Sequence, residues 1–496
     1  MKNLRFVIVF FGVLLVVLLP SGNAIAQPDV KVGSKLFTES VIIGDITEQL
    51  LNEEGLEVVF YKQLGGTRIL WNALRSGEID VYPDYTGTII EEMLGGGNFK
   101  TIDELNNKLE EFGLRATQSL GFNNTYALGM VKAKADKLGV EKTSDLRAHP
   151  DLKYGFSNEF IDRADGWAGL QQSYQLTSTS VTGLDHDLAY RGLQGGSIDV
   201  IDLYSTDAEI DYYQLKVLKD DLHFFPDYDA VILYRKELET TKPKAVQVLK
   251  RLEGKISEPD MIAMNAAVKI DKKEDAVVAS AFILKTFEVQ TEIKTSTLWS
   301  RFITNTLGHL YLVGISLGLA ILFAIPLGII AAKVPAVEKA VLSFVGVLQT
   351  IPSLALLVFM IPLLGIGAVP AMAALFLYSL LPIVRNTHSG IKNISAPLIE
   401  SAQALGLPKG VILRKIELPL ALPTILAGIK TSAVINVGTA TLGALIGAGG
   451  YGQPILTGIR LDSMPLILEG AIPAAVLALL VQGLFDLVEK RFVVHG

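Results

Sequence analysis

The stretch that decides the second half of the fold reads Glu400-Ser-Ala-Gln-Ala-Leu-Gly406-Leu-Pro-Lys-Gly-Val-Ile-Leu-Arg-Lys-Ile416-Glu-Leu418-Pro419. It predicts two short helices joined by a turn, because Gly406 can end the first helix in the left-handed conformation. Small side chains at 401, 402 and 404 leave a surface that another protein can approach closely. The second helix, residues 409–418, carries basic side chains. We therefore expect a helix–turn–helix that docks on a partner protein.

Long apolar segments surround this stretch. We expect membrane spans at about 307–332, 341–364, 369–387, 423–448 and 466–488, each near the roughly 20 residues that a bilayer requires. Charged residues make up only 19% of the chain and mean hydropathy is +0.40. The net charge of −7 offers no basic surface, so we expect no nucleic-acid partner. Cysteine is absent, which excludes disulfides and thiolate metal sites.

The charges between the spans predict an orientation. The loops after the first and third spans and the C-terminal tail contain an excess of basic residues: Lys333, Lys339, Arg385, Lys392, Lys409, Arg414, Lys415, Lys490 and Arg491. The short loop at 365–367 between the second and third spans carries no charge. Because basic loops stay in the cytoplasm, residues 400–419 are predicted to face the cell interior.

The N-terminus is typical of an export signal. Lys2 and Arg5 precede an apolar run of 14 residues, 6–19, and the segment ends in Ala24-Ile-Ala26. A basic head, a short apolar core and a small-residue end predict a signal peptide over 1–26. A retained anchor helix is the alternative. Either one sends the following residues across the membrane.

Residues 30–294 differ from the apolar half. Short β-branched runs alternate with amphipathic segments, which predicts an α/β fold with largely parallel strands. Residues 71–86 are echoed at 190–205, with Gly, Ile-Asp-Val and Tyr at identical spacing, so that Tyr85 corresponds to Tyr204, 119 residues later. We expect both tyrosines at the carboxyl ends of strands, where ligands bind in open α/β sheets.

The docking stretch resembles the coupling loop of ABC importer permeases, whose pattern is E-A-A, three residues, Gly, nine residues, I-x-L-P. The matching positions are Glu400, Ala402, Gly406, Ile416, Leu418 and Pro419, while Ser401 replaces the central Ala. The resemblance implies a cytoplasmic ATP-binding subunit as partner and, because such a permease is half a pore, a homodimer. The chain has no G-x-x-x-x-G-K-[ST] motif, so we expect the partner to bind ATP and this chain to hold no cofactor.

The first half resembles the binding proteins for quaternary-amine osmoprotectants: glycine betaine, choline and carnitine. Five segments carry the resemblance, at 33–40, 82–88, 123–128, 159–166 and 224–229. In that family four tyrosines surround the trimethylammonium group, while a Lys, a Thr and an Arg hold the carboxylate. Carried over by motif, the tyrosine box is Tyr85, Tyr126, Tyr204 and Tyr228, and the carboxylate clamp is Lys35, Thr88 and Arg163.

Some positions depart from the pattern. Asp84 stands where Glu is usual and Asn158 where His is frequent. The binding domain comes first, whereas fused relatives more often place it after the membrane part. An alternative interpretation of Arg163 is a structural ion pair with Asp162 or Asp165. The triplet Asp185-His186-Asp187 lacks spaced metal-ligand partners and is interpreted as a solvated loop.

The predicted architecture is an α/β bilobal periplasmic-binding-protein-like domain at 28–293, followed at 295–496 by an all-α transmembrane ABC importer permease domain with a coupling loop at 393–419. The predicted location is the bacterial cytoplasmic membrane, with the binding domain outside. Choline and ergothioneine are alternative ligands. A ligand-gated receptor or channel and an exported, anchored enzyme are the alternative classes. We expect no catalytic residues and no metal site.

Overall fold

The computed structural model describes residues 28–493, except 164, 178–179 and 294–296. The predicted signal peptide at 1–26 lies outside the described residues. The chain divides into two compact units. One holds the α/β part and a short segment at 457–464, and the other holds the remaining helices from 297 onward.

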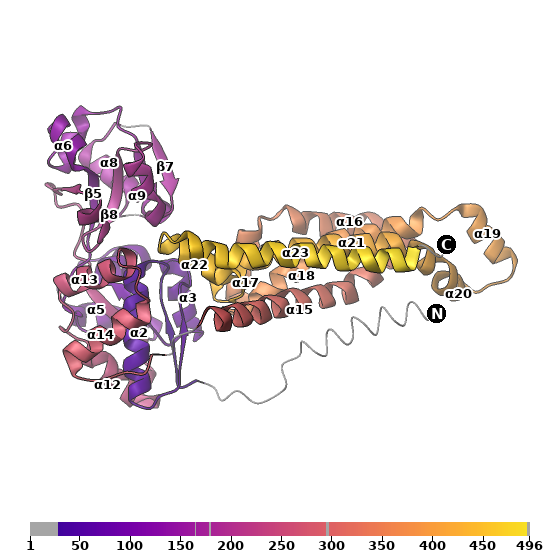
Figure 1. Ribbon diagram of the computed structural model, residues 1–496, viewed down its shortest axis with the longest axis horizontal. Coiled ribbons are helices and arrows are strands. Elements are labelled where there is room, and N and C mark those ends of the chain that lie inside the picture. Colours follow the sequence, from indigo (N-terminus) through magenta and orange to yellow (C-terminus); the bar gives the residue numbers. More distant parts are fainter. Residues whose placement is uncertain (1–27, 164, 178–179, 294–296, 494–496) are drawn as a thin grey trace. The chain divides into compact units, whose positions relative to one another are not determined.

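The α/β unit contains two lobes, each built on a five-stranded sheet (Figure 1). The first sheet has the order β2-β1-β3-β10-β4, and the second has the order β7-β6-β8-β5-β9. In each sheet the first three strands are parallel and the fourth runs antiparallel to them. The expectation of largely parallel strands therefore holds for three strands of each sheet. The last two strands in each order are joined by antiparallel pairing. The strands are β1 (Val30–Gly33), β2 (Val58–Tyr61), β3 (Val81–Tyr85), β4 (Leu114–Ala116), β5 (Tyr126–Val131), β6 (Tyr154–Ser157), β7 (Val181–Leu184), β8 (Val200–Tyr204), β9 (Leu215–Leu218) and β10 (Ala230–Arg235).

Two chain crossings join the lobes. One runs from β4 to β5 and the other from β9 back to β10. The crossings pair with each other. The backbone N–H of Asn124 donates to the backbone carbonyl of Tyr228 at 3.0 Å, and Asn123 forms an antiparallel bridge with Asp229. A pair of short connected strands is the arrangement expected of a hinge, because a few backbone angles at element ends absorb a lobe movement.

Helices cover both sheets. Strands β3 and β10 are almost wholly buried, as expected for strands packed on both faces. The long helix α2 packs against β1, β2 and β3, with its side chains from 38 to 47 buried. The helices of this unit are α2 (Thr38–Glu53), α3 (Thr67–Ser76), α4 (Thr86–Thr88), α5 (Ile102–Leu109), α6 (Lys132–Leu138), α7 (Asn158–Asp162), α8 (Trp167–Tyr174), α9 (His186–Gln194), α10 (Glu209–Tyr212), α11 (Leu238–Thr241), α12 (Pro243–Arg251), α13 (Glu258–Lys269) and α14 (Asp275–Phe287), with 3₁₀ turns η2 (Glu110–Phe112) and η3 (Thr143–Ala148) and a π-helical turn η1 (Ile89–Met93).

The second unit is helical. Its helices α15 (Leu298–Lys333), α18 (Ala368–Lys392) and α21 (Leu418–Thr439) pack on one another. Glycines permit the close approach: a Cβ on Gly328 would lie 2.6 Å from Thr387 Cβ, and one on Gly428 would lie 2.7 Å from the Pro382 carbonyl. Small residues at helix contacts are typical of membrane helices. The remaining elements are α16 (Pro335–Thr350), α17 (Ser353–Leu364), α19 (Ala396–Ala404), α20 (Lys409–Ile412), η4 (Leu413–Glu417), η5 (Ala440–Ile446), α22 (Gly452–Arg460) and α23 (Met464–Val493).

Four described helices are long and apolar enough to cross a membrane: Leu298–Lys333, Ala368–Lys392, Lys409–Ile446 and Met464–Lys490. The segment expected to form a span at 341–364 contains a bend. It is a pair of helices, α16 and α17, bent by 99°, and it gives a fifth span only if the pair counts as one. The bend lies at Ile351-Pro352, where Ile351 is extended (φ −69°, ψ 126°) because a following proline disfavours the helical conformation.

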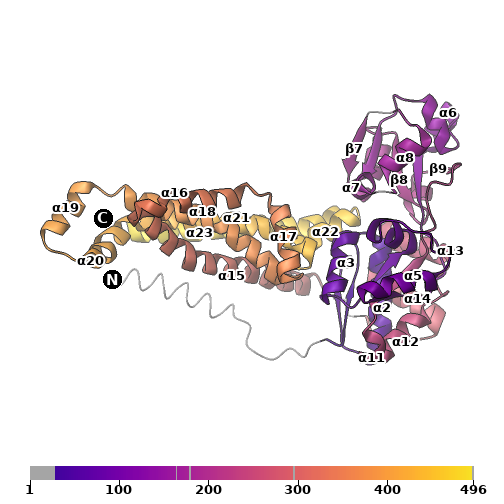
Figure 2. The ribbon, with the colours of Figure 1, turned by 180° about the vertical axis from the view of Figure 1, so that it is seen from behind.

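Figure 2 shows α19 and α20 beyond the ends of the long helices of their unit. Helix α19 ends at Ala404, and Gly406 takes the left-handed conformation with φ of 74°, which confirms the predicted helix end. The second predicted helix is observed as α20, the π-helical turn η4 and the start of α21. The stretch therefore forms the predicted helix–turn–helix.

The position of β10 in the interior of its sheet allows the core to be tested. Ile232 is fully buried in a strand that pairs on both sides. We expect Ile232→Ala to lower the free energy of unfolding by about 2–5 kcal/mol, because it removes buried methylenes and leaves a cavity. The measurement is urea unfolding of the full chain, followed by tryptophan fluorescence, to which Trp71 and Trp167 of the α/β unit contribute. Val59→Ala is the control, since Val59 is 39% exposed on the edge strand β2 and should change stability little. Equal losses in the two variants would contradict the assignment of β10 to the core.

Candidate ligand-binding site

Four tyrosines meet where the two lobes face each other. Tyr85 ends β3 and Tyr204 ends β8, so the two echoed segments place equivalent tyrosines at equivalent strand ends, as expected. Tyr126 begins β5 directly opposite Tyr204, and Tyr228 lies in the second crossing. The ring centroid of Tyr126 is 5.0 Å from that of Tyr204 and 5.6 Å from that of Tyr228.

All seven residues predicted for the box and the clamp line one small cavity. The rings lie close together, and the cavity of about 20 Å³ has room for about one water molecule. Sequence reasoning missed three residues of the lining: Phe37, Asn124 and Glu159. The ring of Phe37 lies between two box tyrosines, at 6.1 Å from Tyr85 and 5.6 Å from Tyr204. Phe37 and Asn124 lie within the segments 33–40 and 123–128 that carried the resemblance. Each is two residues from a predicted site residue, Lys35 or Tyr126, and this nearness in sequence was the signal that could have identified them.

The Lys35 ammonium is paired with a carboxylate from strand β3. Its Nζ donates to Asp84 Oδ1 at 2.6 Å, and both side chains are almost completely buried. The same Asp84 oxygen accepts the Tyr85 backbone amide at 2.8 Å. Asp84, which departs from the family pattern, is therefore the counter-ion of Lys35 and also fixes the end of β3.

Arg163 is paired in the same way. Its guanidinium donates to both oxygens of Asp165, at 2.7 and 2.5 Å. Of the two carboxylates that the sequence offered, Asp165 is the partner. Arg163 also approaches Thr88 Oγ1 of the other lobe at 3.4 Å, and its guanidinium lies 5.3 Å from the ring centre of Tyr126. Both clamp cations thus lie beside the box with their charge already balanced.

The phenol groups of the box divide into two kinds. Tyr126 and Tyr204 face each other with their hydroxyls 3.4 Å apart. Tyr85 and Tyr228 instead donate to carboxylates, Tyr85 to Glu39 Oε1 at 2.5 Å and Tyr228 to Asp165 Oδ2 at 2.5 Å. Burial raises the pKa of all four phenols, so each remains neutral at physiological pH.

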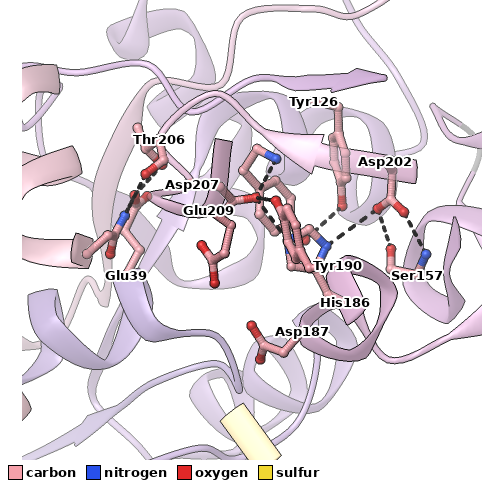
Figure 3. Close-up of polar contacts among 12 residues, drawn as sticks. Glu39, Tyr126, Ser157, His186, Asp187, Tyr190, Asp202, Thr206, Asp207 and Glu209 are labelled. Atoms are coloured by element: carbon pink, nitrogen blue, oxygen red, sulfur yellow. Dashed lines mark hydrogen bonds and ion pairs between the residues drawn. The ribbon is translucent and has the colours of Figure 1, made fainter. Parts of the chain in front are cut away.

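Glu39 is a buried acid behind the box. It lies in the first turn of α2, is 3% exposed, and accepts four hydrogen bonds. The donors are Tyr85 and Asn124 on one oxygen and Thr206 and Asn265 on the other, at 2.5 to 3.1 Å. Figure 3 shows Thr206 bonded to Glu39. Burial raises the pKa of Glu39 to about 7, although the hydrogen bonds from Thr206, Tyr85 and Asn265 oppose this rise.

The triplet at 185–187 is not a solvated loop, and that interpretation is wrong. Asp185 caps the N-terminus of α9, and His186 is enclosed with a side chain 12% exposed (Figure 3). Its ring lies 4.4 Å from that of Tyr204, and its Nε2 is 3.0 Å from Asp207 Oδ2. Burial disfavours the charged imidazole, but Asp207 and Asp202 outweigh burial and raise the His186 pKa well above 6.5.

Polar contacts also join the lobes around the box. Lys269 at the end of α13 donates to Asp187 at 2.5 Å and pairs with Glu209, both on the other lobe. Thr67 at the start of α3 donates to Glu159 at 2.9 Å. Beside these contacts lies a larger cavity of about 600 Å³, within the usual size of ligand sites. It shares five residues with the box cavity: Lys35, Phe37, Glu159, Arg163 and Tyr204.

The predicted coupling residues gather on the docking stretch of the helical unit. Glu400 is exposed on α19, and Ala402 beside it is buried. Ile416 lies in η4, and Leu418 and Pro419 begin α21. Between them the buried Glu417 pairs with Lys333 at the end of α15, which fastens the docking stretch to a long helix.

Two family models match this chain. Residues 28–285 match the substrate binding domain of ABC-type glycine betaine transport systems, and residues 324–494 match the inner membrane component of binding-protein-dependent transport systems. The first match covers more than half of the chain. The docking stretch lies within the second.

Individual relatives resemble either half. The glycine betaine/carnitine/choline transport system permease protein OpuCB of Bacillus subtilis is 43% identical over 188 residues, which are 38% of this chain and 87% of OpuCB. The ergothioneine transport permease/ergothioneine binding protein EgtU of Helicobacter pylori is 35% identical over 268 residues, 53% of this chain and 48% of EgtU. A crystal structure of a glycine betaine/carnitine/choline ABC transporter is 32% identical, covers 52% of this chain and 98% of its own, and has a TM-score of 0.45.

The raised pKa of Glu39 predicts a pH dependence of stability. Between its usual value of 4.5 and about 7, the folded chain holds a proton on Glu39 that the unfolded chain has lost. The free energy of unfolding should therefore fall as pH rises through this window, by up to about 3 kcal/mol from this residue. We expect the thermal midpoint of the full chain, followed by tryptophan fluorescence, to fall less between pH 5 and pH 8 in Glu39→Gln than in the wild type. The same fall in both proteins would contradict the assignment.

Proposed function

Because this chain belongs to the family of ABC-type glycine betaine transport systems, as a substrate-binding domain fused to an inner-membrane component, we propose that the tyrosine box receives the quaternary ammonium of its ligand. The observation that carries this proposal is the meeting of four tyrosines at one point between the lobes, three of them buried and Tyr204 half-buried. A quaternary ammonium has no N–H group, so hydrogen bonds cannot hold it. Aromatic faces can, with each ring contributing roughly 0.5–2 kcal/mol.

The ligand class in this proposal is a zwitterion such as glycine betaine or carnitine. Lys35, Thr88 and Arg163 line the same cavity as the box, and they bind the ligand carboxylate. The two cations are balanced by Asp84 and Asp165, so a carboxylate adds charge-assisted hydrogen bonds without having to neutralise bare cations. Since the rings lie nearly in contact, the lobes separate to admit the ligand and close around it. Closure follows binding because the closed form binds the ligand better.

The larger cavity favours a second candidate, a betaine with a bulky substituent. It adjoins the box and holds about 600 Å³, far more than the methylene of glycine betaine fills. Ergothioneine, a betaine of histidine, is such a ligand, and the relative EgtU is an ergothioneine binding protein by name. Choline, which lacks the carboxylate, leaves the clamp unused.

Removing one ring tests the box. We expect Tyr204→Ala to weaken binding of every quaternary amine by about tenfold or more, because it deletes one aromatic face and the packing of Phe37 and His186 against it. The measurement is calorimetric titration of the full chain in detergent with glycine betaine, carnitine, choline and ergothioneine. Tyr212→Ala is the matched control, since Tyr212 is 59% exposed on the same lobe. Unchanged affinity for all four compounds would refute the box, and the tightest of the four identifies the ligand.

The helical unit supplies the pathway and the connection to ATP. In this proposal residues 400–419 face the cytoplasm and dock on a separate ATP-hydrolysing subunit, while two copies of this chain form the pore. The chain itself catalyses no reaction and binds no ATP. Exposed leucines on the docking stretch support this, with Leu405 79% exposed and Leu398 44% exposed at its first helix. The Lys333–Glu417 pair then carries motion from the docking stretch to α15.

The exposed leucine offers a test of the connection. We expect Leu405→Asp to abolish copurification of the ATP-binding subunit and uptake into reconstituted vesicles, because a charge replaces an apolar contact at the interface. Ligand affinity should stay unchanged, since the binding cleft lies in the other compact unit. Leu222→Asp, at a leucine 50% exposed in the α/β unit, is the control and should retain the subunit. Uptake without any ATP-binding subunit would instead favour the ligand-gated channel.

A further inference from the structure

Glu39 is a buried acid of the cleft whose charge no basic side chain balances. Lys35 and Arg163 are each paired with a carboxylate, and Asp165 is therefore balanced as well. The four donors that surround Glu39 are a phenol, a hydroxyl and two amides, all of them uncharged. Within the described part of the chain, no ion pair includes Glu39. Asp84 and Asp165, the other buried acids beside the box, each have a basic partner, whereas Glu159, which lines the same cavity, is only partly buried.

The hydrogen-bond partners of Glu39 suit its ionised form, which predominates above its pKa of about 7. Each carboxylate oxygen accepts two hydrogen bonds, so the donors are arranged around a full negative charge. Glu39 also lies in the first turn of α2, a helix of 16 residues, where the helix dipole favours an anion. The charge is nevertheless buried, and it lies directly behind one wall of the tyrosine box.

The Tyr85 hydroxyl connects this charge to the box. It donates to Glu39 at 2.5 Å, which pushes electron density from the phenol oxygen into the ring. A ring that is more negative attracts a cation on its face more strongly, since the interaction depends on the ring quadrupole. The field of the carboxylate adds to this attraction through a water-poor region, where charges are screened weakly. Glu39 can thus act on a ligand that it does not touch.

We propose that Glu39 is a specificity-determining residue that selects a cationic ligand head over a neutral one of the same shape, by placing a buried negative charge behind Tyr85. The proposal rests on the proposed function, since it requires a quaternary ammonium in the box. Glu39 also fixes the geometry, because Thr206 of the second lobe lies two residues after Tyr204 and bonds to the same carboxylate (Figure 3). A purely structural role would follow from that geometry alone.

The test compares a charged ligand with its carbon isostere. Glycine betaine and 3,3-dimethylbutanoate share their shape and carboxylate, but only betaine carries the positive charge. Dissociation constants are measured at pH 8.5, where Glu39 is ionised, on the full chain in lipid nanodiscs, the weaker ligand by competition against the stronger. We expect the wild type to prefer betaine and Glu39→Gln to reduce this preference about tenfold. A structural role alone would weaken both ligands equally and leave the ratio unchanged, which would overturn the proposal.

Three further variants make the result specific. Asp45→Asn is the matched control: Asp45 is a second buried acid on α2, but it pairs with Lys62 and has no contact with the box, so the preference should be unchanged. Glu39→Asp retains the charge and should keep most of the preference. If Glu39→Gln does not fold, Tyr85→Phe carries the test, because it keeps the ring and breaks the connection to Glu39. An unchanged preference in Tyr85→Phe would then overturn the proposal.

The proposed function and the proposed role of Glu39 are refuted by different results. A wild-type chain that binds no quaternary amine refutes the proposed function. A wild-type chain that binds betaine, and a Glu39→Gln variant with the same preference for it, refute only the role of Glu39.

Discussion

The binding cleft depends on one constraint: a charge removed from water needs a partner. Lys35 is buried with Asp84, Arg163 with Asp165, and Lys269 with Asp187 and Glu209. Because breaking a buried pair leaves an uncompensated charge, each pair fixes its two elements in one arrangement. The Lys269 pairs join one lobe to the other, and the Arg163 pair holds that side chain beside Thr88 across the cleft. In the proposed binding mode, walls held in this way leave the aromatic faces and the buried Glu39 to determine which ligand fits.

Many residues of the cleft could be predicted from the sequence. They lie at the ends of strands, and the repeat of residues 71–86 at 190–205 indicates where two of those strands end. Tyr85 and Tyr204 lie at equivalent positions for that reason. What could not be predicted were contacts between distant segments. The partners of Glu39 come from four places along the chain, and no spacing in the sequence indicates them. His186 was misread for the same reason, since the acid that holds it, Asp207, lies 21 residues later.

The helical unit shows the same division between local and non-local information. Hydropathy located the apolar segments, and Gly406 marked the end of α19 because a left-handed turn is a local property. Hydropathy did not show the 99° bend between α16 and α17, since both helices are apolar and differ only in direction. Pro352 was the available signal, but a proline is also tolerated inside α15, α18 and α21. Whether a proline bends a membrane helix depends on its neighbours.

The buried acid behind the box has a consequence for how this protein can change. A buried charge without a basic partner lowers stability above the pKa of the group. Selection for stability alone would therefore act against an acid at this position. Persistence of an acid at this position in a lineage would therefore record continued selection on the discrimination of ligands, and its loss would mark lineages that had turned to uncharged cargo.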